Sequence, residues 1–277
     1  MNLETAKEVV RPTSPEQVGA WRDGYAWLAG GTWLFSEPQA HLSTLIDLEA
    51  LGWRSLVVSQ DGLEIAATCR IAELHDFEGP AEWTAVPLFK ACCDALLASH
   101  KVWNTATVGG NICMSLPAGA MTSLTSALEG VATLLPREGP ARQMTIPDFV
   151  VGNNRNVLAP GDLMRAIHLP ASALRKRFAV RQTSRTHLGR SAALIIGTVA
   201  HDARDFRLTI TAATPRPVQI GFATIPSADD LRDAIDARIA ADGYFDDVHG
   251  SAAYKRHLTP YFAEEIRAEL ARGEYAT

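Results

Sequence analysis

Two short segments of the sequence place adjacent glycines next to a threonine. They are Leu28-Ala29-Gly30-Gly31-Thr32 and Ala106-Thr107-Val108-Gly109-Gly110-Asn111. Glycine reaches positive φ and lets backbone N–H groups close on an anion, and the threonine hydroxyl adds a hydrogen-bond donor. Either segment alone is more typical of an ordinary tight turn, but the two together could clasp one pyrophosphate. Their separation along the chain implies two substructures that meet at the ligand.

Other common catalytic and nucleotide-binding patterns are absent from the sequence. Neither glycine turn has the G-x-G-x-x-G spacing of a Rossmann nucleotide turn or the lysine of a P-loop. The cysteines form no C-x-x-C pair, so we expect buried thiols rather than a metal or iron–sulfur site. No Ser-His-Asp or Cys-His nucleophile arrangement is recognisable. We therefore assign no catalytic residue and no metal ligand.

The bulk composition predicts a compact soluble protein. The chain has 277 residues, of which 47% are hydrophobic, and a formal net charge of -5. Its basic residues are scattered, which disfavours a nucleic-acid partner. The N-terminus lacks the apolar core of a secretory signal, and no apolar stretch approaches the length of a membrane span. We expect a cytoplasmic protein with no membrane or nucleic-acid contact.

The first part of the chain is expected to alternate short helices and strands. Ser14 as N-cap, Pro15 at the first helical position and Gln17 at capping-box spacing predict a helix that ends near Asp23-Gly24. A polar turn at residues 59–62 has the chemistry of a hairpin connection. The predicted strands are Tyr25–Ala29, Thr44–Leu48, Leu56–Val58 and Leu63–Ala67.

Two helices, a loop and a break are predicted in the middle of the chain. Pro87 begins one helix, and a second begins around Thr122 with an apolar face that extends to Val131. The segment from Pro136 to Pro147 is rich in Pro, Gly and charge, which indicates a surface hairpin or loop. His168-Leu169-Pro170 indicates a break, and we place a domain boundary near Pro170.

The remaining residues are expected to form a smaller second part. Seven basic side chains lie between Arg175 and Arg190. We interpret them as a solvated strand face rather than as a site for an anionic partner or a cofactor phosphate. Apolar periodicity predicts strands at Leu194–Val199 and Phe206–Ala212 and helices at Ala228–Ala241 and Thr259–Arg272. The fold class is therefore mixed α and β.

Taken together, these segments resemble the FAD-binding medium subunits of molybdenum hydroxylases, the family of bacterial xanthine and carbon monoxide dehydrogenases. The second glycine turn is the most specific element, and the matching segments follow the family's order over almost the whole chain. They are Leu28–Thr32, Leu45–Leu48, Leu63–Ala67, Asn104 with Ala106–Asn111, Ser115 with Pro117–Gly119, Ile167–Pro170, and Gly250-Ser251 with Tyr254–Arg256.

The resemblance implies an α+β fold of the p-cresol methylhydroxylase (PCMH) type. Residues 1–170 would form a two-part α/β FAD-binding region with a break near residues 53–60, and residues 171–277 a smaller C-terminal domain with an antiparallel sheet and helices. Ser115 would face the flavin nucleotide and Gln182 the ring edge. The full set of FAD-contacting residues implied is Ala26, Trp27, Leu28, Ala29, Gly30, Gly31, Thr32, Trp33, Thr107, Val108, Gly109, Gly110, Asn111, Ser115 and Gln182.

Four positions depart from the family's pattern. Trp33 replaces an aspartate that often follows the first Gly-Gly-Thr, and Trp103 replaces an arginine. Ala120 stands where an acidic residue is usual, and Gln182 where a basic residue is often found. We expect contacts to the ribityl chain, adenine or flavin ring to differ accordingly. Each tryptophan either contacts the cofactor or lines the site, or else packs in the ordinary way or lies on a subunit surface.

By the same resemblance, the chain would take electrons from 2Fe–2S clusters to FAD and on to a terminal acceptor. A small subunit would hold the clusters and a large subunit the molybdopterin, in a dimer of heterotrimers. Two alternatives stay open. One is a self-sufficient FAD oxidase or dehydrogenase, for which the second part of the chain is small. The other is a non-catalytic nucleotide-binding assembly module.

Overall fold

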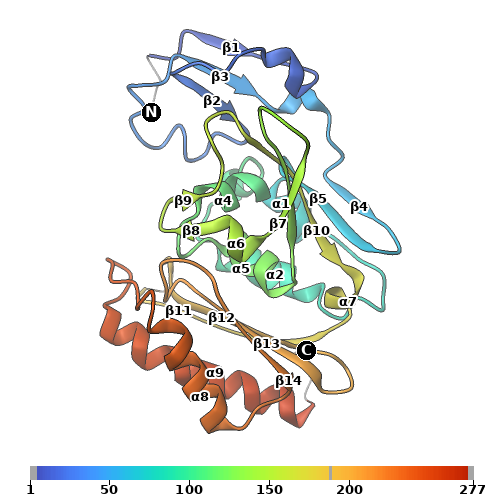
Figure 1. The fold of residues 1–277 in the computed structure, drawn as a ribbon, viewed down its shortest axis with the longest axis vertical. Coiled ribbons are helices and arrows are strands. Elements are labelled where there is room, and N and C mark those ends of the chain that lie inside the picture. Colours follow the sequence, from blue (N-terminus) through green and yellow to red (C-terminus); the bar gives the residue numbers. More distant parts are fainter. Residues whose placement is uncertain (1–4, 187–188, 274–277) are drawn as a thin grey trace.

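Three main β-sheets follow one another along the long axis of the molecule (Figure 1). The structure is a computed structural model that describes residues 5–186 and 189–273, so His187 of the basic segment lies outside the described residues. A two-stranded ribbon, β8 (Val150–Gly152) with β9 (Arg155–Asn156), accompanies the second sheet. The helices lie mainly beside the second and third sheets.

The first sheet is small and parallel. Its strands are β1 (Glu8–Val10), β2 (Tyr25–Leu28) and β3 (Thr44–Asp47), in the order β1-β3-β2. All of β3 is buried, as expected for the central strand of a parallel sheet. β2 and β3 confirm two predicted strands, and β2 leads directly into the first glycine turn.

The predicted first helix is wrong in its length and in its cap. Only a short 3-10 helix forms, η1 (Pro15–Val18). The Ser14 side chain caps no backbone N–H, and the Gln17 side chain accepts instead from the backbone N–H of Thr13 at 2.8 Å. Gly19, with a φ of 63°, ends the helix well before the predicted end.

The second sheet is antiparallel, in the order β4-β5-β10-β6-β7. Its strands are β4 (Leu56–Val58), β5 (Gly62–Ala66), β6 (Val131–Leu135), β7 (Arg142–Thr145) and β10 (Leu163–Pro170). β4 with β5 confirms one predicted hairpin, and β6 with β7 confirms the surface hairpin. The break predicted at His168-Leu169-Pro170 is wrong, because these residues continue β10 and Pro170 pairs with Gly62 of β5.

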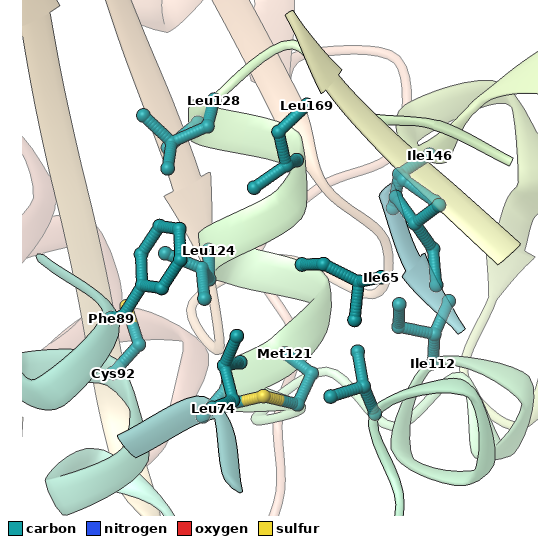
Figure 2. Packing of buried hydrophobic residues seen from close by; sticks show 14 of the residues in the cluster. Ile65, Leu74, Phe89, Cys92, Ile112, Met121, Leu124, Leu128, Ile146 and Leu169 are labelled. Carbon is teal, nitrogen blue, oxygen red and sulfur yellow. The ribbon is translucent and has the colours of Figure 1, made fainter. Parts of the chain in front are cut away.

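A fully buried helix, α5 (Ala120–Ala127), lies at the centre of the largest core. It packs on α2 (Pro87–Ala95), α4 (Val108–Met114) and two strands of the third sheet. Figure 2 shows Met121 and Leu124 of α5 among the side chains of Phe89, Ile65 and Ile112. The shorter helices are η2 (Glu49–Leu51), α1 (Ile71–His75), α3 (His100–Trp103), α6 (Ile146–Phe149) and α7 (Ala171–Leu174).

α2 and α5 confirm the two predicted helices of the middle segment, with one correction. Val131 was expected on the face of the second helix but is the first residue of β6. The helix ends at Ala127, and Glu129 then takes a φ of 57°, which reverses the chain. Val131 therefore belongs to a strand whose alternate residues, Ala132 and Leu134, are buried, rather than to a continuing helix.

The third sheet is an antiparallel meander covered by two helices. Its strands are β11 (Arg177–Ser184), β12 (Ser191–Val199), β13 (Arg204–Thr211) and β14 (Val218–Thr224). α8 (Ala228–Ile239) and α9 (Ala252–Arg272) lie on one face, and α5 packs on the other. β12 is buried along its whole length: Leu194 and Ile196 join the core around α5, whereas Ala193 and Ile195 join the core under α9.

β12, β13 and α8 confirm three predicted elements, but α9 begins earlier than expected. It starts at Ala252 rather than Thr259, where the Ser251 side chain accepts from the N–H of Tyr254 at 3.2 Å. Pro260 lies inside the helix. Because proline usually marks a helix start or end, it concealed the first two turns.

Two side chains of the basic segment between Arg175 and Arg190 form ion pairs within the protein. Lys176 is buried, and its Nζ lies 2.5 Å from Glu129 and 2.6 Å from Asp205. Arg181 on β11 pairs in the same way with two glutamates of α9. The prediction of a solvated strand face is therefore wrong for these two side chains.

Candidate functional site

A groove of about 800 Å³ runs between the two glycine turns. Further parts of its wall come from residues Ala95–Ala98 at the end of α2, from Cys113, Met114 and Leu116–Gly119 at the end of α4, and from the loop Phe245–His249 before α9. The groove thus collects residues from the first sheet, the helices beside the second sheet and the C-terminal part of the chain. Its volume is in the range of pockets that take large organic ligands.

The first glycine turn offers unused hydrogen-bond donors to this groove. In the described part of the chain, the backbone N–H groups from Gly30 to Trp33 have no protein acceptor. Geometry requires both glycines: a Cβ on Gly30 would lie 1.9 Å from the carbonyl oxygen of Thr105, and Gly31 has a φ of 68°. The turn therefore presents backbone dipoles that suit an anion.

The second glycine turn begins α4, and its first backbone donors are already occupied. The N–H groups of Val108 and Gly109 donate to carbonyls of the segment that follows β5, and that of Gly110 donates to Thr107 Oγ1 at 3.1 Å. The expectation that both turns offer the same backbone chemistry is therefore wrong. Of this turn, Ala106, Thr107, Gly110 and Asn111 line the groove, whereas Val108 and Gly109 do not.

Gly109 and Gly110 have different structural roles. A Cβ on Gly109 would lie 2.4 Å from the Cβ of Ala67, so this glycine allows α4 to pack against the chain after β5. A Cβ on Gly110 would meet only Thr107 Oγ1, at 2.8 Å, and Gly110 faces the groove. Asn111 Oδ1 accepts from the N–H of Met121 at 3.1 Å, which orients its side-chain amide at the groove wall.

The C-terminal part of the chain supplies a polar wall to the groove. Arg190, Asp247 and His249 all line it. Asp247 is held from behind by Lys255 of α9, which is 0% exposed and whose Nζ lies 2.9 Å from Asp247 Oδ1. The guanidinium carbon of Arg190 lies 5.9 Å from the ring centre of Trp33, which follows the first glycine turn.

The groove lining leaves out some of the predicted contact residues. Ser115 is buried with a φ of 51°, ends α4, and donates from Oγ to the carbonyl of Ile112 at 3.0 Å. Gln182 is exposed on β11 and donates to Ser191 Oγ at 3.0 Å. Ser115 thus has the contacts of a turn residue, and Gln182 those of an exposed strand position. The predicted residues outside the lining are Ala26, Val108, Gly109, Ser115 and Gln182.

The two tryptophans that flank the turns differ in their surroundings. Trp33 lines the groove, whereas Trp103 packs its ring 4.9 Å from that of His75 and is not part of the lining. No motif of the sequence marks Arg190 or the loop Phe245–His249 as site residues. The nearest signal is the resemblance at Gly250-Ser251, immediately after that loop.

Residues 5–186 and 189–273 contain neither a candidate metal site nor a membrane-spanning helix. No group of three His, Cys, Asp or Glu side chains there could hold a metal ion. Burial raises the pKa of the Cys93 and Cys113 thiols to about 12. No helix in the same residues has the length and apolar character needed to cross a bilayer.

Residues 5–172 match a known protein family, the FAD binding domain in molybdopterin dehydrogenase. The chain belongs to this family. Curated relatives of this FAD binding domain include xanthine dehydrogenase of Oryza sativa, 26% identical over 122 residues, and aldehyde oxidase 2 of Cavia porcellus, 32% identical over 123 residues. The alignments cover 42% and 41% of this chain, and 9% of each relative's length.

Solved structures share the fold of this FAD binding domain protein over nearly its whole length. Carbon monoxide dehydrogenase of Hydrogenophaga pseudoflava, in a form lacking the Mo-pyranopterin moiety, has a TM-score of 0.82 and 23% identity over 98% of this chain and 99% of that one. Quinoline 2-oxidoreductase of Pseudomonas putida 86 has a TM-score of 0.79 and 19% identity over 99% of both chains. The predicted α+β fold is thereby confirmed.

Proposed function

We propose that the chain binds FAD in the groove, with the pyrophosphate on the first glycine turn. The support is the run of backbone N–H groups from Gly30 to Trp33, which have no acceptor among the described residues, together with Thr107 and Asn111, which line the same groove. A Cβ on Gly110 would narrow this cradle. The groove is also large enough for a dinucleotide.

The residues of this chain would bind FAD and orient it. Bound flavin supplies the redox chemistry, as cofactors generally do. The first turn neutralises phosphate charge through its backbone dipoles, and the apolar residues after α2 offer a surface to a planar ring. The loop Phe245–His249 and Arg190 form the wall on the other side. Electron transfer through this chain needs no protein acid or base, so we assign no catalytic residue.

We further propose that the chain is the flavoprotein component of a cytoplasmic, multi-subunit molybdenum hydroxylase. Electrons from substrate oxidation at a molybdopterin-bearing large subunit would reach it through 2Fe–2S clusters of a small subunit and leave to a terminal acceptor. A dimer of heterotrimers is the assembly we expect. The family match over residues 5–172 and the shared fold with carbon monoxide dehydrogenase chains support this assignment.

A division of the chain into residues 1–170, with a break near residues 53–60, and residues 171–277 is part of the same proposal. The sheets support it. The first sheet ends with β3, the second opens with β4 and includes β10 up to Pro170, and the third begins with β11 at Arg177. The FAD groove would then lie where these units meet.

The unpaired N–H groups of the first turn carry the proposal, and absorption spectra test it. We expect the chain expressed alone to be yellow with a flavin spectrum, and the chain co-expressed with neighbouring reading frames to co-purify with subunits that add iron–sulfur absorbance. A folded chain that is colourless and does not bind added FAD would rule the proposal out. A yellow chain that turns over substrate alone would favour the self-sufficient oxidase.

A further inference from the structure

The groove lining carries few charged side chains. Among the described residues that form it, Arg190 is the single lysine or arginine, and Glu37 and Asp247 are the carboxylates. Lys255 already neutralises Asp247 from behind, at 2.9 Å. A pyrophosphate would add negative charge to a chain whose formal net charge is already -5. Backbone N–H groups carry only partial charges, so a full cation within reach gives the stronger partner.

Among the described residues, Arg190 contacts an aromatic ring and forms no ion pair. Its guanidinium carbon lies 5.9 Å from the ring centre of Trp33, which is a cation–π distance. No described carboxylate or carbonyl accepts a hydrogen bond from it, although Arg185 of the same segment donates to the carbonyl of Val248 at 3.3 Å. The whole planar fork of N–H donors therefore remains available, and this fork matches a phosphate group.

The position of Trp33 brings that fork close to the expected anion. Trp33 directly follows Gly30–Thr32, and all four residues line the groove. Resting on Trp33, Arg190 stands beside the place where an anion on the first turn would lie. A charge-assisted bidentate bond to a phosphate is stronger than an exposed cation–π contact. Binding of an anion therefore favours movement of the Arg190 guanidinium from the Trp33 ring to the phosphate.

We propose that Arg190 leaves Trp33 when FAD binds and clamps the FAD pyrophosphate from the C-terminal side of the groove. This inference rests on the proposed function. Arg190 stands immediately before β12, so the clamp is anchored in the third sheet, while the first glycine turn follows β2 of the first sheet. The pyrophosphate would thus connect two parts of the chain that are far apart in sequence.

Titration calorimetry of the flavin-free full-length chain tests this clamp. The ligands are FAD, ADP, which keeps the pyrophosphate without the flavin, and riboflavin, which keeps the flavin without the pyrophosphate. We expect Arg190→Gln to weaken FAD and ADP binding by roughly 10- to 100-fold and to leave riboflavin unchanged. Arg190→Lys should give an intermediate loss, because lysine keeps the charge without the fork.

A matched control is Arg204→Gln, which removes an exposed arginine that pairs with Asp202 outside the groove and should leave all affinities unchanged. If Arg190→Gln binds FAD as tightly as the wild type does, the clamp is overturned and the proposed function is not. Equal losses of FAD and riboflavin with unchanged ADP would place Arg190 on the ring and also overturn it. A wild-type chain that binds none of the three ligands would overturn the proposed function and the clamp with it.

Discussion

The buried ammonium group of Lys255 lies 2.9 Å from Asp247 Oδ1, and the same oxygen accepts the backbone N–H groups of His249 and Gly250. Lys255 is 0% exposed and also lies 5.2 Å from the ring centre of Phe245. One carboxylate oxygen therefore ties α9 to the loop that forms the C-terminal wall of the groove. The shape of that wall depends on a charge located behind it.

Removing either member of this pair should destabilise the fold, and the loss of Asp247 should cost more. Asp247→Ala leaves the Lys255 ammonium buried without compensation, so we expect the free energy of unfolding to fall by about 3–5 kcal/mol. Lys255→Met should cost less, because Asp247 keeps two backbone donors and is partly exposed. Urea unfolding measures both. A double variant should recover much of the loss, and a double variant as unstable as Asp247→Ala would contradict the explanation.

The two glycines at the start of α4 should respond differently to the same substitution. Gly110→Val places its side chain toward Thr107 and the groove, so we expect a folded, colourless protein that loses about 1 kcal/mol at the disturbed helix cap. Gly109→Val drives a side chain into Ala67 and should destabilise the fold by about 1–3 kcal/mol or more. Flavin absorbance and urea unfolding separate the two effects. A Gly110→Val chain that stays fully yellow would refute the assigned role.

The ion pair of Asp205 with Lys176 predicts acid sensitivity at the junction of β11 and β13. Burial by itself raises the pKa of the Asp205 carboxyl, but the hydrogen bond from Lys176 and the charges of Lys176 and Arg207 outweigh it and lower the pKa overall. A carboxyl with a lowered native pKa stabilises the fold fully above its ordinary pKa, and that stabilisation is lost as the pH falls through the native value. Asp205→Asn should therefore be less stable than wild type at neutral pH.

Unfolding midpoints measured across the acidic range check this sign. The difference between wild type and Asp205→Asn should shrink as the pH falls below the ordinary aspartate range. Asp202→Asn is a useful comparison, because Asp202 pairs with Arg204 on an exposed turn and should contribute little. A difference between wild type and Asp205→Asn that is independent of pH would show that the charge of Asp205 does not matter.

The cysteines should resist alkylation in the folded chain. Burial raises the pKa of the Cys93 and Cys113 thiols to about 12 and raises those of Cys69 and Cys92 as well. Since the thiolate is the reactive form, we expect negligible labelling by iodoacetamide at pH 8 and rapid labelling in urea, as read by intact mass. Fast labelling of Cys113 in the native chain would mean that the groove opens beyond the structure described.

Elements with a complete local signal could be predicted from the sequence. The β4–β5 hairpin has two apolar strands around a polar turn, and α8 has one apolar face. The start of α9 was predicted too late, because Pro260 suggests that a helix begins near it. The helix continues through Pro260 since Lys255, Thr259 and Ala263 are all buried along one side, a tertiary property that a local pattern does not contain.

From the sequence, the two glycine turns could be predicted as parts of the site, but the state of their hydrogen-bond donors could not. Both turns face the groove, but the availability of their backbone donors depends on distant segments. The N–H of Val108 donates to the carbonyl of Cys69, whereas those of Gly30 to Trp33 meet no acceptor within residues 5–186 and 189–273. Arg190 carries no motif, because its proposed role depends on its contact with Trp33, a residue distant in the sequence.

The burial of β12 on both of its faces constrains how the sequence of this chain can evolve. Its alternate residues belong to two cores, with Leu194 and Ile196 facing α5 and Ala193 and Ile195 facing α9. A graft that replaced only the part after Pro170 with that of a relative would bring an unmatched surface against α5. The two parts of the chain must therefore be inherited and altered together, and heat should melt them in one cooperative step.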